Sequence, residues 1–258
     1  MDDAEQTDPG EALRAQARRH GGAAFTEQLT QPDVADLSFE ERLAMVVDRE
    51  YTLREEKRLV RRLKTARLKQ PACVEDIDYR HPRGLDRQTV RSLSNCQWIK
   101  GHQNIIVTGP TGVGKTYLSC AFANKACREG YTAVYTRLPR LLHDITLAKA
   151  DGSYTKLLNR LARTDVLVVD DWGLAPLTET ERRDFLEVLD DRQDCRSTIM
   201  TSQLPITNWH DNIGDPTIAD AILDRLLHNS HRVALKGESM RKLRAGKKEN
   251  LTQTDQGM

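Results

Sequence analysis

The sequence predicts an α/β fold, a parallel five-stranded sheet flanked by helices, with a small N-terminal helical domain. From residue 104 onward, short runs rich in β-branched residues alternate with longer helical segments, which is typical of a parallel sheet covered on both faces. A glycine-rich turn at residues 109–116 joins the first such run to the first helix. From Ser38 to about Lys69 the pattern is helical. These observations divide the chain into domains at 37–70 and 104–245.

The N-terminal domain is expected to be helical over residues 37–70. Ser38 with Glu41 forms a capping-box pattern, apolar residues recur near helical spacing as far as Leu63, and no proline interrupts the stretch before Pro71. Residues 71–103 contain prolines and Gly84, so we expect a linker there with one helix across 86–95. The polar ends of the chain, residues 1–36 and 246–258, are expected to be disordered.

The strands and helices of the second domain follow from its composition. Strands are expected at 104–109, 132–136, 166–170, 197–202 and 232–236, and helices at 114–128, at 138–163 in two pieces, at 179–193 and at 217–229. Thr178 with Glu181 forms a second capping box, and Asp215 with Pro216 supplies a cap and a first-turn proline for the last helix.

Composition excludes several classes of protein. The chain has 258 residues and a formal net charge of +1, and no stretch approaches the roughly 20 apolar residues of a membrane span. Its acidic, polar N-terminus is unlike a signal peptide. The five cysteines lack metal-ligand spacing, so reduced structural thiols in a cytoplasmic protein are expected.

The turn "GPTGVGKT" matches the phosphate-binding pattern G-x-x-x-x-G-K-[ST] in full, between a strand and a helix as that pattern requires. Its glycines let the backbone curl so that N–H groups point at phosphate oxygens, and the helix adds its positive dipole end. Lys115 can reach the β- and γ-phosphates, and Thr116 can ligate Mg²⁺. The predicted nucleotide site comprises Gly109, Pro110, Thr111, Gly112, Val113, Gly114, Lys115 and Thr116.

Two adjacent carboxylates end the apolar strand in "DVLVVDDWG", residues 165–173. A phosphate-binding loop needs a second partner for its Mg²⁺, and Asp170 fits that role. Asp171 points differently and can polarise the water that attacks the γ-phosphate, whereas a kinase would present its acceptor's hydroxyl there. The pair therefore favours hydrolysis. The alternative is that Asp171 only caps the following turn.

The nucleotide is expected to be ATP, bound with Mg²⁺. The guanine-reading pattern N/T-K-x-D is absent, because "NKAC" at 124–127 has Cys127 where an aspartate is required. The basic lid of a small-molecule kinase is not found either.

Two further segments contain residues that could act on the γ-phosphate. The strand "STIMTSQ", residues 197–203, ends in Thr201, Ser202 and Gln203, of which we favour Ser202 or Gln203; an ordinary polar strand end is the alternative. Arg225 lies in an otherwise apolar helical segment. It is either a surface arginine or a finger that reaches the nucleotide of a neighbouring subunit, in which case activity requires assembly.

Several runs together resemble the IstB family, the ATPase helper proteins of one class of bacterial insertion sequence. They are residues 37–68, "GPTGVGKT", "VLVVDDWG", "TSQLP" at 201–205, and "IGDPTIADAILDRLLHNSHRVALKGESMRK" at 213–242. The resemblance implies an AAA+ ATPase of the initiator branch, related to DnaC-type helicase loaders and DnaA-type initiators. It further implies ATP-dependent assembly as a ring or spiral on duplex DNA, DNA bending, and recruitment and stimulation of an integrase-type transposase.

The resemblance also implies roles for single residues. Lys115 and Thr116 would bind nucleotide and Mg²⁺, Asp170 the metal, Asp171 the attacking water, and Arg225 would be the inter-subunit finger. Arg241, in "GESMRK", would stand near a second nucleotide sensor, although the small helical lid usual in the superfamily is nearly missing. Gln203 stands where many relatives have asparagine.

Two basic clusters are candidates for DNA contact. Residues 57–69 carry no acid, which favours a phosphate-facing helix end over a merely solvated charge run; their cations are Lys57, Arg58, Arg61, Arg62, Lys64, Arg67 and Lys69. The second cluster, between the second and third strands, contains Arg137, Arg140, Lys149, Lys156 and Arg160. Neither contains a base-reading motif, so backbone contact independent of sequence is expected.

Three functions remain open from the sequence. A transposition helper would assemble on duplex DNA with ATP. A helicase-loader-like adaptor would grip a helicase and prefer single strands. A metabolic P-loop enzyme would turn over ATP as a monomer and would not respond to DNA.

Overall fold

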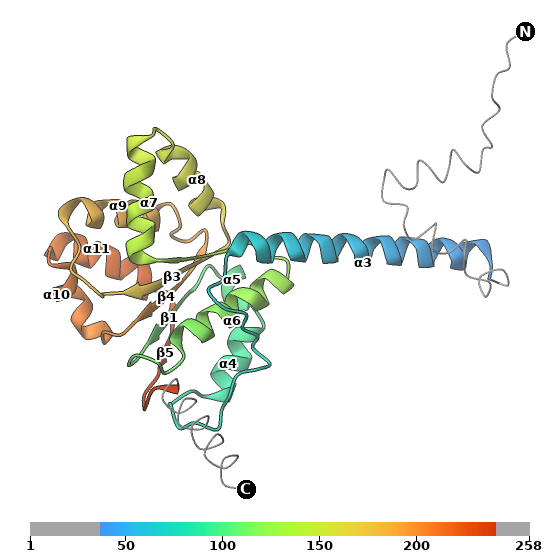
Figure 1. Cartoon of the computed structure of the whole chain (residues 1–258), viewed down its shortest axis with the longest axis horizontal. Helices are drawn as coiled ribbons and strands as arrows, with labels where there is room; N and C mark the ends of the chain where they lie inside the picture. Colours follow the sequence, from blue (N-terminus) through green and yellow to red (C-terminus); the bar gives the residue numbers. More distant parts are fainter. Residues whose placement is uncertain (1–36, 241–258) are drawn as a thin grey trace, which may run out of the picture. The chain divides into compact units, whose positions relative to one another are not determined.

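The structure of the chain is a computed structural model that describes residues 37–240 (Figure 1). Contacts divide the chain into two units, Met1–Arg61 and Arg62–Met258. The described part of the first unit is helical, because α3 spans Phe39–Ala66 and ends in the second unit. Ser38 and Glu41 form the predicted capping box: the Ser38 amide donates to Glu41 Oε2 at 2.9 Å, and the Glu41 amide donates to Ser38 Oγ at 3.3 Å.

The second unit is built on a parallel five-stranded sheet in the order β2-β3-β4-β1-β5, which confirms the predicted fold class. The strands are β1 (Asn104–Thr108), β2 (Ala133–Arg137), β3 (Val166–Trp172), β4 (Ser197–Ser202) and β5 (Ser230–Ala234). Because β4 lies between β1 and β3, side chains at the carboxyl ends of these three strands meet at one edge of the sheet.

Helices cover both faces of the sheet (Figure 1). They are α4 (Arg87–Ser94), α5 (Gln97–Lys100), α6 (Lys115–Arg128), α7 (Leu138–Ala150), α8 (Tyr154–Arg163), α9 (Glu179–Asp190), α10 (Trp209–Ile213) and α11 (Pro216–Leu227), with a short 3₁₀ turn, η2 (Ile206–Asn208). Helix α6 lies along one face against β1, β2, β3 and β4, while α7 packs on β2 and β3, and α9 and α11 pack on each other. The predicted capping box of α9 is present, with Glu181 and Thr178 as partners.

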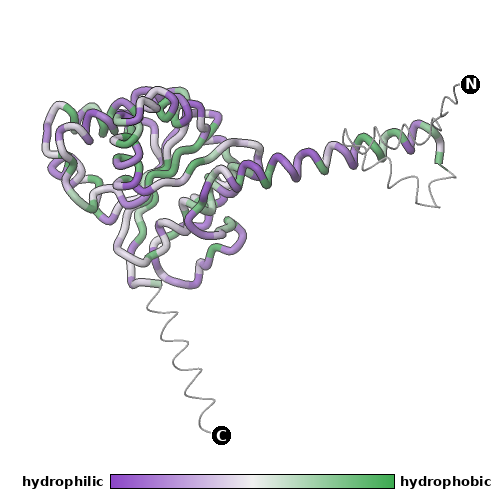
Figure 2. The backbone as a smooth tube through the Cα atoms, turned by 45° about the horizontal axis from the view of Figure 1, so that its top comes forward, coloured by the Kyte–Doolittle hydropathy of each residue, from purple (hydrophilic) through white to green (hydrophobic). Residues whose placement is uncertain are grey.

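The core follows the apolar strands. Residues 166–169 of β3 and 105–107 of β1 are fully buried, as expected when helices cover both faces of a parallel sheet. Figure 2 shows this hydrophobic band through the middle of the second unit. At the end of β3, Trp172 stacks between Phe185 of α9 and Trp209 of α10, with ring centroids 5.3 and 5.5 Å apart.

Residues 71–103, predicted as a linker, belong to the second unit. The predicted helix across 86–95 is present as α4, capped by Asp86, which accepts from the Thr89 amide. The segment also buries apolar side chains that fix it against the rest of the unit, namely Ala72, Val74, Ile77, Val90, Leu93, Trp98 and Ile99. Burying these side chains outweighs the turn-forming effect of the prolines. Of the helices between residues 37 and 240, none has the length and apolar character to cross a membrane.

Candidate active site

The phosphate-binding loop connects β1 to α6. Helix α6 begins at Lys115, and Gly114 precedes it with φ +103°. Gly112 also has a positive φ, +85°, and a Cβ there would lie 2.0 Å from Ser239 Oγ, so only glycine fits. Lys115 Nζ donates to the carbonyls of Gly109 at 2.7 Å and Pro110 at 2.8 Å. The loop therefore carries a cation and the amino end of a 14-residue helix at the same place.

Asp170 lies at the carboxyl end of β3, 1 % exposed. Its carboxylate accepts from the Thr116 hydroxyl at 2.9 and 3.2 Å, from the Tyr135 hydroxyl at 2.6 Å, and from the Thr201 hydroxyl. These oxygens suit Mg²⁺, which prefers oxygen ligands and usually takes one or two carboxylates with substrate phosphates. Thr116 and Asp170 are therefore the candidates to hold the ion together with the phosphates of a bound nucleotide.

Asp171 is turned away from Asp170 by its backbone. It has φ +66°, which is uncommon for a residue other than glycine, and it lies where the β3–β4 register shifts between Val169 and Trp172. Its carboxylate forms an ion pair with Arg137, with 3.2 Å between Arg137 Nε and Asp171 Oδ2. Arg137 ends β2, beside β3. The two adjacent carboxylates thus have different partners.

The three candidate sensors at the end of β4 differ in what they touch. Ser202 is fully buried and donates to the Trp172 carbonyl at 2.9 Å, so its hydroxyl is bound within the core. Gln203 is exposed, and its Oε1 accepts from the Thr111 hydroxyl of the loop at 2.6 Å. Thr201 donates to Asp170 and accepts from the Asp171 amide at 3.3 Å. Gln203 and Thr201 therefore reach the site directly, and Ser202 does not.

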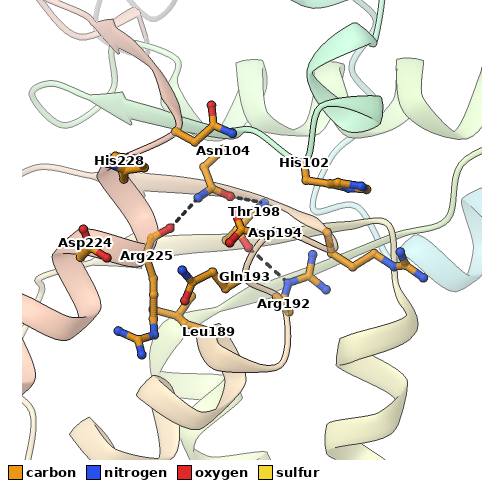
Figure 3. A pocket seen from close by; sticks show the side chains of 12 residues that line it. His102, Asn104, Leu189, Arg192, Gln193, Asp194, Thr198, Asp224, Arg225 and His228 are labelled. Atoms are coloured by element: carbon orange, nitrogen blue, oxygen red, sulfur yellow. Dashed lines mark hydrogen bonds between the residues drawn. The ribbon is translucent and has the colours of Figure 1, made fainter.

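Arg225 lies at the opposite edge of the sheet from the phosphate-binding loop. Its carbonyl accepts from Asn104 Nδ2 at 2.9 Å, and Asn104 begins β1, whose other end leads into the loop. Five residues of strand put that amino end roughly 13 Å from Thr108. Arg225 is one of the residues that line a cavity of about 320 Å³ (Figure 3). Its guanidinium is ion-paired with Asp190 of α9.

Residues from both basic clusters line one cavity of about 560 Å³. Lys64 and Arg67 come from the end of α3 and the turn after it, and the other cations come from β2, α7 and α8; together they are Lys64, Arg67, Arg137, Arg140 and Arg160, and we call this set the basic groove. Asp144 is the acid on its wall and pairs with Arg140 at 2.9 Å. Tyr135 also lines the groove, so its hydroxyl links the groove to Asp170.

The other predicted DNA-contacting residues do not line the groove. Lys57, Arg58 and Arg61 are exposed on the part of α3 in the first unit, where Arg58 pairs with Glu55 at 2.6 Å. In the second unit, Lys149 is ion-paired with Asp184, Lys69 and Lys156 are exposed, and Arg62 is half-buried. Arg241 lies outside the described residues. Its neighbour Met240 donates its amide to the Gly112 carbonyl at 2.9 Å, so the chain reaches the phosphate-binding loop just before that position.

Two residues at the site were not predicted. Tyr135 bonds Asp170 from β2, and Arg83, from the segment thought to be a linker, lies against the phosphate-binding loop, with Nη1 2.9 Å from the Val113 carbonyl. Neither belongs to a sequence motif. The available signal for Tyr135 was its position near the end of the strand expected beside β3; for Arg83 there was none.

The fold is similar to those of replication initiators and helicase loaders. A DnaA structure bound to AMPPCP and single-stranded DNA matches with a TM-score of 0.54 and 16 % identity, covering 67 % of this chain and 52 % of that chain. A DnaI structure matches with a TM-score of 0.54 and 19 % identity over 65 % of this chain and 95 % of that one. A structure of the DnaC helicase loader matches with a TM-score of 0.52 and 19 % identity, covering 64 % of this chain and 97 % of that chain. These likenesses show a P-loop fold of the AAA+ type.

Several insertion-sequence proteins share a higher sequence identity with this chain than these structures do. An insertion-sequence ATP-binding protein of Sinorhizobium fredii is 48 % identical over 85 % of this chain and 89 % of the relative. The ATP-binding protein of insertion sequence IS1162 from Pseudomonas fluorescens is 51 % identical over 72 % of this chain and 82 % of the relative. The ATP-binding protein of IS21 from Pseudomonas aeruginosa is 35 % identical over 83 % of this chain and 80 % of the relative. The model of the IstB-like ATP-binding proteins matches residues 14–248. The chain therefore belongs to the IstB-like family of insertion-sequence ATP-binding proteins.

Proposed function

We propose that this protein is an ATPase that oligomerises on target duplex DNA, remodels it, and recruits and stimulates the transposase of its insertion sequence. The observation that carries the proposal is the junction between the ATP site and the basic groove. Tyr135 connects the groove to Asp170, and Arg137 connects it to Asp171. A DNA-binding surface that shares residues with a hydrolytic site suits a DNA-dependent motor better than a metabolic enzyme.

The proposed reaction is hydrolysis of the bond between the β- and γ-phosphates. Lys115 and the loop amides hold the phosphates, and Thr116 with Asp170 holds Mg²⁺, which when bound offsets the charge on the phosphate oxygens. Asp171 accepts a proton from water as the water oxygen attacks the γ-phosphorus and the bridging oxygen leaves with the β-phosphate. Thr201 and Gln203 are the candidate γ-phosphate sensors, supported by their contacts with Asp170 and Thr111.

The proposed DNA contact is electrostatic. The basic groove offers five cations against one acid on its wall, Asp144, which suits contact with the phosphate backbone of DNA. Each phosphate neutralised steepens the fall of affinity with salt, with a slope of about −0.9 per phosphate in a log–log plot. Binding to duplexes of unrelated sequence is therefore expected to be similar, and to weaken steeply between low and moderate salt.

DNA stimulation of the ATPase would pass through Arg137. In the structure its guanidinium is bound to the carboxylate that the reaction needs as a base. A DNA phosphate in the groove competes for the same guanidinium, and Asp171 is then available to the water. The ion pair thus restrains hydrolysis until DNA is present.

Arg137→Gln tests this coupling, with Arg140→Gln as the matched control because Arg140 pairs with Asp144 instead. Both variants lose one groove cation, so both should bind duplex more weakly. Only Arg137→Gln should raise ATP turnover without DNA, and it should lower the ratio of turnover with DNA to turnover without DNA. Equal behaviour of the two variants would count against the coupling.

The proposed oligomer shares its ATP sites between subunits. Arg225 is too far along the sheet to reach the phosphates of its own loop, so its contact with ATP requires a neighbouring copy in a head-to-tail assembly, a ring or spiral. In such an assembly the guanidinium would leave Asp190 for the neighbour's γ-phosphate.

The function as a whole is tested by binding of fluorescent duplexes of random sequence, with ATP and Mg²⁺, at low and moderate salt. We expect ATP-dependent, salt-sensitive binding that Lys115→Ala abolishes, and stimulation of strand transfer when the transposase of the same insertion sequence is added. Preference for single strands and capture of a replicative helicase would support the helicase-loader alternative. Turnover by a monomer that DNA does not affect would refute both.

A further inference from the structure

Arg83 is a buried cation beside the phosphate-binding loop. Its side chain is 5 % exposed and lines a cavity of about 140 Å³ together with Gly112, Gly114, Lys115 and Thr116. Nη1 donates to the Val113 carbonyl at 2.9 Å and Nη2 to the Asp78 carbonyl at 3.0 Å. A Cβ on Gly114 would lie 2.4 Å from Nη1, so the guanidinium rests against the turn that opens α6.

The carboxylate of Asp78, which lines the same cavity, attracts this guanidinium without forming an ion pair with it. Within residues 37–240 Arg83 forms no ion pair, and its Nε is buried without a hydrogen-bond partner. The nearby carboxylate of Asp78 is bound by Arg80 and lies 3.7 Å from His81. Burying a charge that has no ion-pair partner is unfavourable, and carbonyl oxygens offset only part of the cost. Burial accordingly lowers the pKa of Arg83.

The backbone holds Arg83 in place from two sides. The Lys236 amide donates to its carbonyl at 2.9 Å, while the carbonyl of its neighbour Pro82 lies 3.0 Å from where a Cβ on Gly237 would be. Residues 236–240 then continue to the Met240–Gly112 hydrogen bond. The guanidinium is therefore fixed at the phosphate-binding loop before any ligand arrives, which reduces the entropy cost of using it for binding.

We propose that Arg83 is a further nucleotide-binding residue, whose charge is balanced by the phosphate chain of the bound nucleotide. The proposal rests on the proposed ATP site and extends it to the segment 71–103. Arg83 supplies a second cation beside Lys115, from a different segment of the chain, and the N–H groups of Nη1 and Nη2 that the two carbonyls do not use can donate to phosphate oxygens.

The test compares Arg83→Met with Arg87→Met, because Arg87 is an exposed arginine of the same segment that stacks on Tyr79. Affinities of the full chain for ATP and for inorganic tripolyphosphate, which lacks the base, are measured by calorimetry, and thermal unfolding is followed without ligand. Arg83→Met should weaken both ligands by about 10- to 100-fold, the effect of losing a charge-assisted hydrogen bond. Its unfolding temperature without ligand should stay equal or rise, because a buried charge without an ion-pair partner is gone. Arg87→Met should bind both ligands normally.

An Arg83→Met protein that melts earlier but binds tripolyphosphate as the wild type does would overturn the proposal and make Arg83 a structural clamp on Val113. If Arg83→Met does not fold, the tripolyphosphate affinity and melting temperature of Arg83→Lys distinguish a binding role from a structural one. A lysine keeps the charge but cannot bond both carbonyls, so retained tripolyphosphate affinity with a lowered melting temperature supports the proposal, and loss of affinity contradicts it. If the wild type itself binds no ATP, the proposed function fails instead, which is a separate result.

Discussion

At the scale of single residues, Asp170 shows how hydroxyl groups hold a buried carboxylate in place. The hydroxyls of Thr116, Tyr135 and Thr201 each donate a hydrogen bond to its carboxylate. Burial and the hydrogen bond to Asp170 raise the pKa of Tyr135, so this phenol keeps its proton and remains a donor. The carboxylate is held in one orientation by three different elements.

Tyr135→Phe removes one of these donors without changing the packing of the ring. We expect a loss of about 1.5–3 kcal/mol in the free energy of unfolding, typical of a hydrogen bond to a charged group, measured by urea titration. We also expect a higher Mg²⁺ requirement for ATP binding, because Asp170 is less well oriented.

Tyr154→Phe is the control for that experiment. Tyr154 donates to Glu187 in an exposed pair on α8 and α9, so its loss should cost less and leave the Mg²⁺ requirement unchanged. Equal effects of the two substitutions would show that Tyr135 does not orient the metal carboxylate.

At the scale of elements, the sequence predicts those features that depend on residues close together in the chain. The capping boxes of α3 and α9 depend on residues three apart, and the strand β3 on four consecutive apolar residues; each is present as predicted. The phosphate-binding loop is equally local, because its glycines and the start of α6 adjoin in sequence.

Contacts between segments that are far apart in the chain could not be predicted from the sequence. The ion pair of Arg137 with Asp171 depends on the positive φ of Asp171, which no residue type in "VDDW" demands. The position of Arg83 depends on residues 71–103 folding back over the loop, driven by scattered apolar side chains such as Val74 and Trp98 that have no helical or strand period. The joining of two basic clusters in one groove likewise needs the tertiary fold.

The capping box of α9 gives a prediction at this scale. Thr178→Ala removes the acceptor for the Glu181 amide and should lower the free energy of unfolding by about 1 kcal/mol in a urea titration. Thr207→Ala is the control, because Thr207 is exposed and bonds only the neighbouring Asn208 side chain, so its effect should be within about 0.5 kcal/mol. An unchanged free energy of unfolding in Thr178→Ala would mean that the stability of α9 does not depend on its cap.

At the scale of the whole molecule, thiol reactivity reports the fold. Burial raises the pKa values of Cys96 and Cys127 to about 11 and also raises that of Cys120, whereas Cys195 is exposed. The thiolate is the reactive form, so at pH 8 the three buried thiols are both protonated and covered.

Iodoacetamide at pH 8 should therefore label Cys195 first, then the half-buried Cys73, and should reach the remaining three only when urea unfolds the chain. Mass spectrometry of timed samples checks the order. Rapid labelling of Cys127 in the native protein would show that α6 does not lie on the sheet as described.

The central claim is that each ATP site is completed by a neighbouring subunit, and mixing two inactive variants tests it most directly. Lys115→Ala lacks the loop cation, and Arg225→Gln lacks the finger. With both variants folded, as urea titration checks, each alone should show little DNA-dependent ATP turnover.

Mixed in equal amounts, the two variants form some interfaces in which an intact Lys115 meets an intact Arg225, about one quarter if mixing is random. Turnover with duplex DNA should then recover to about a quarter of the wild-type rate. Full activity of Arg225→Gln alone, or no recovery in mixtures that do assemble on DNA, would contradict the account.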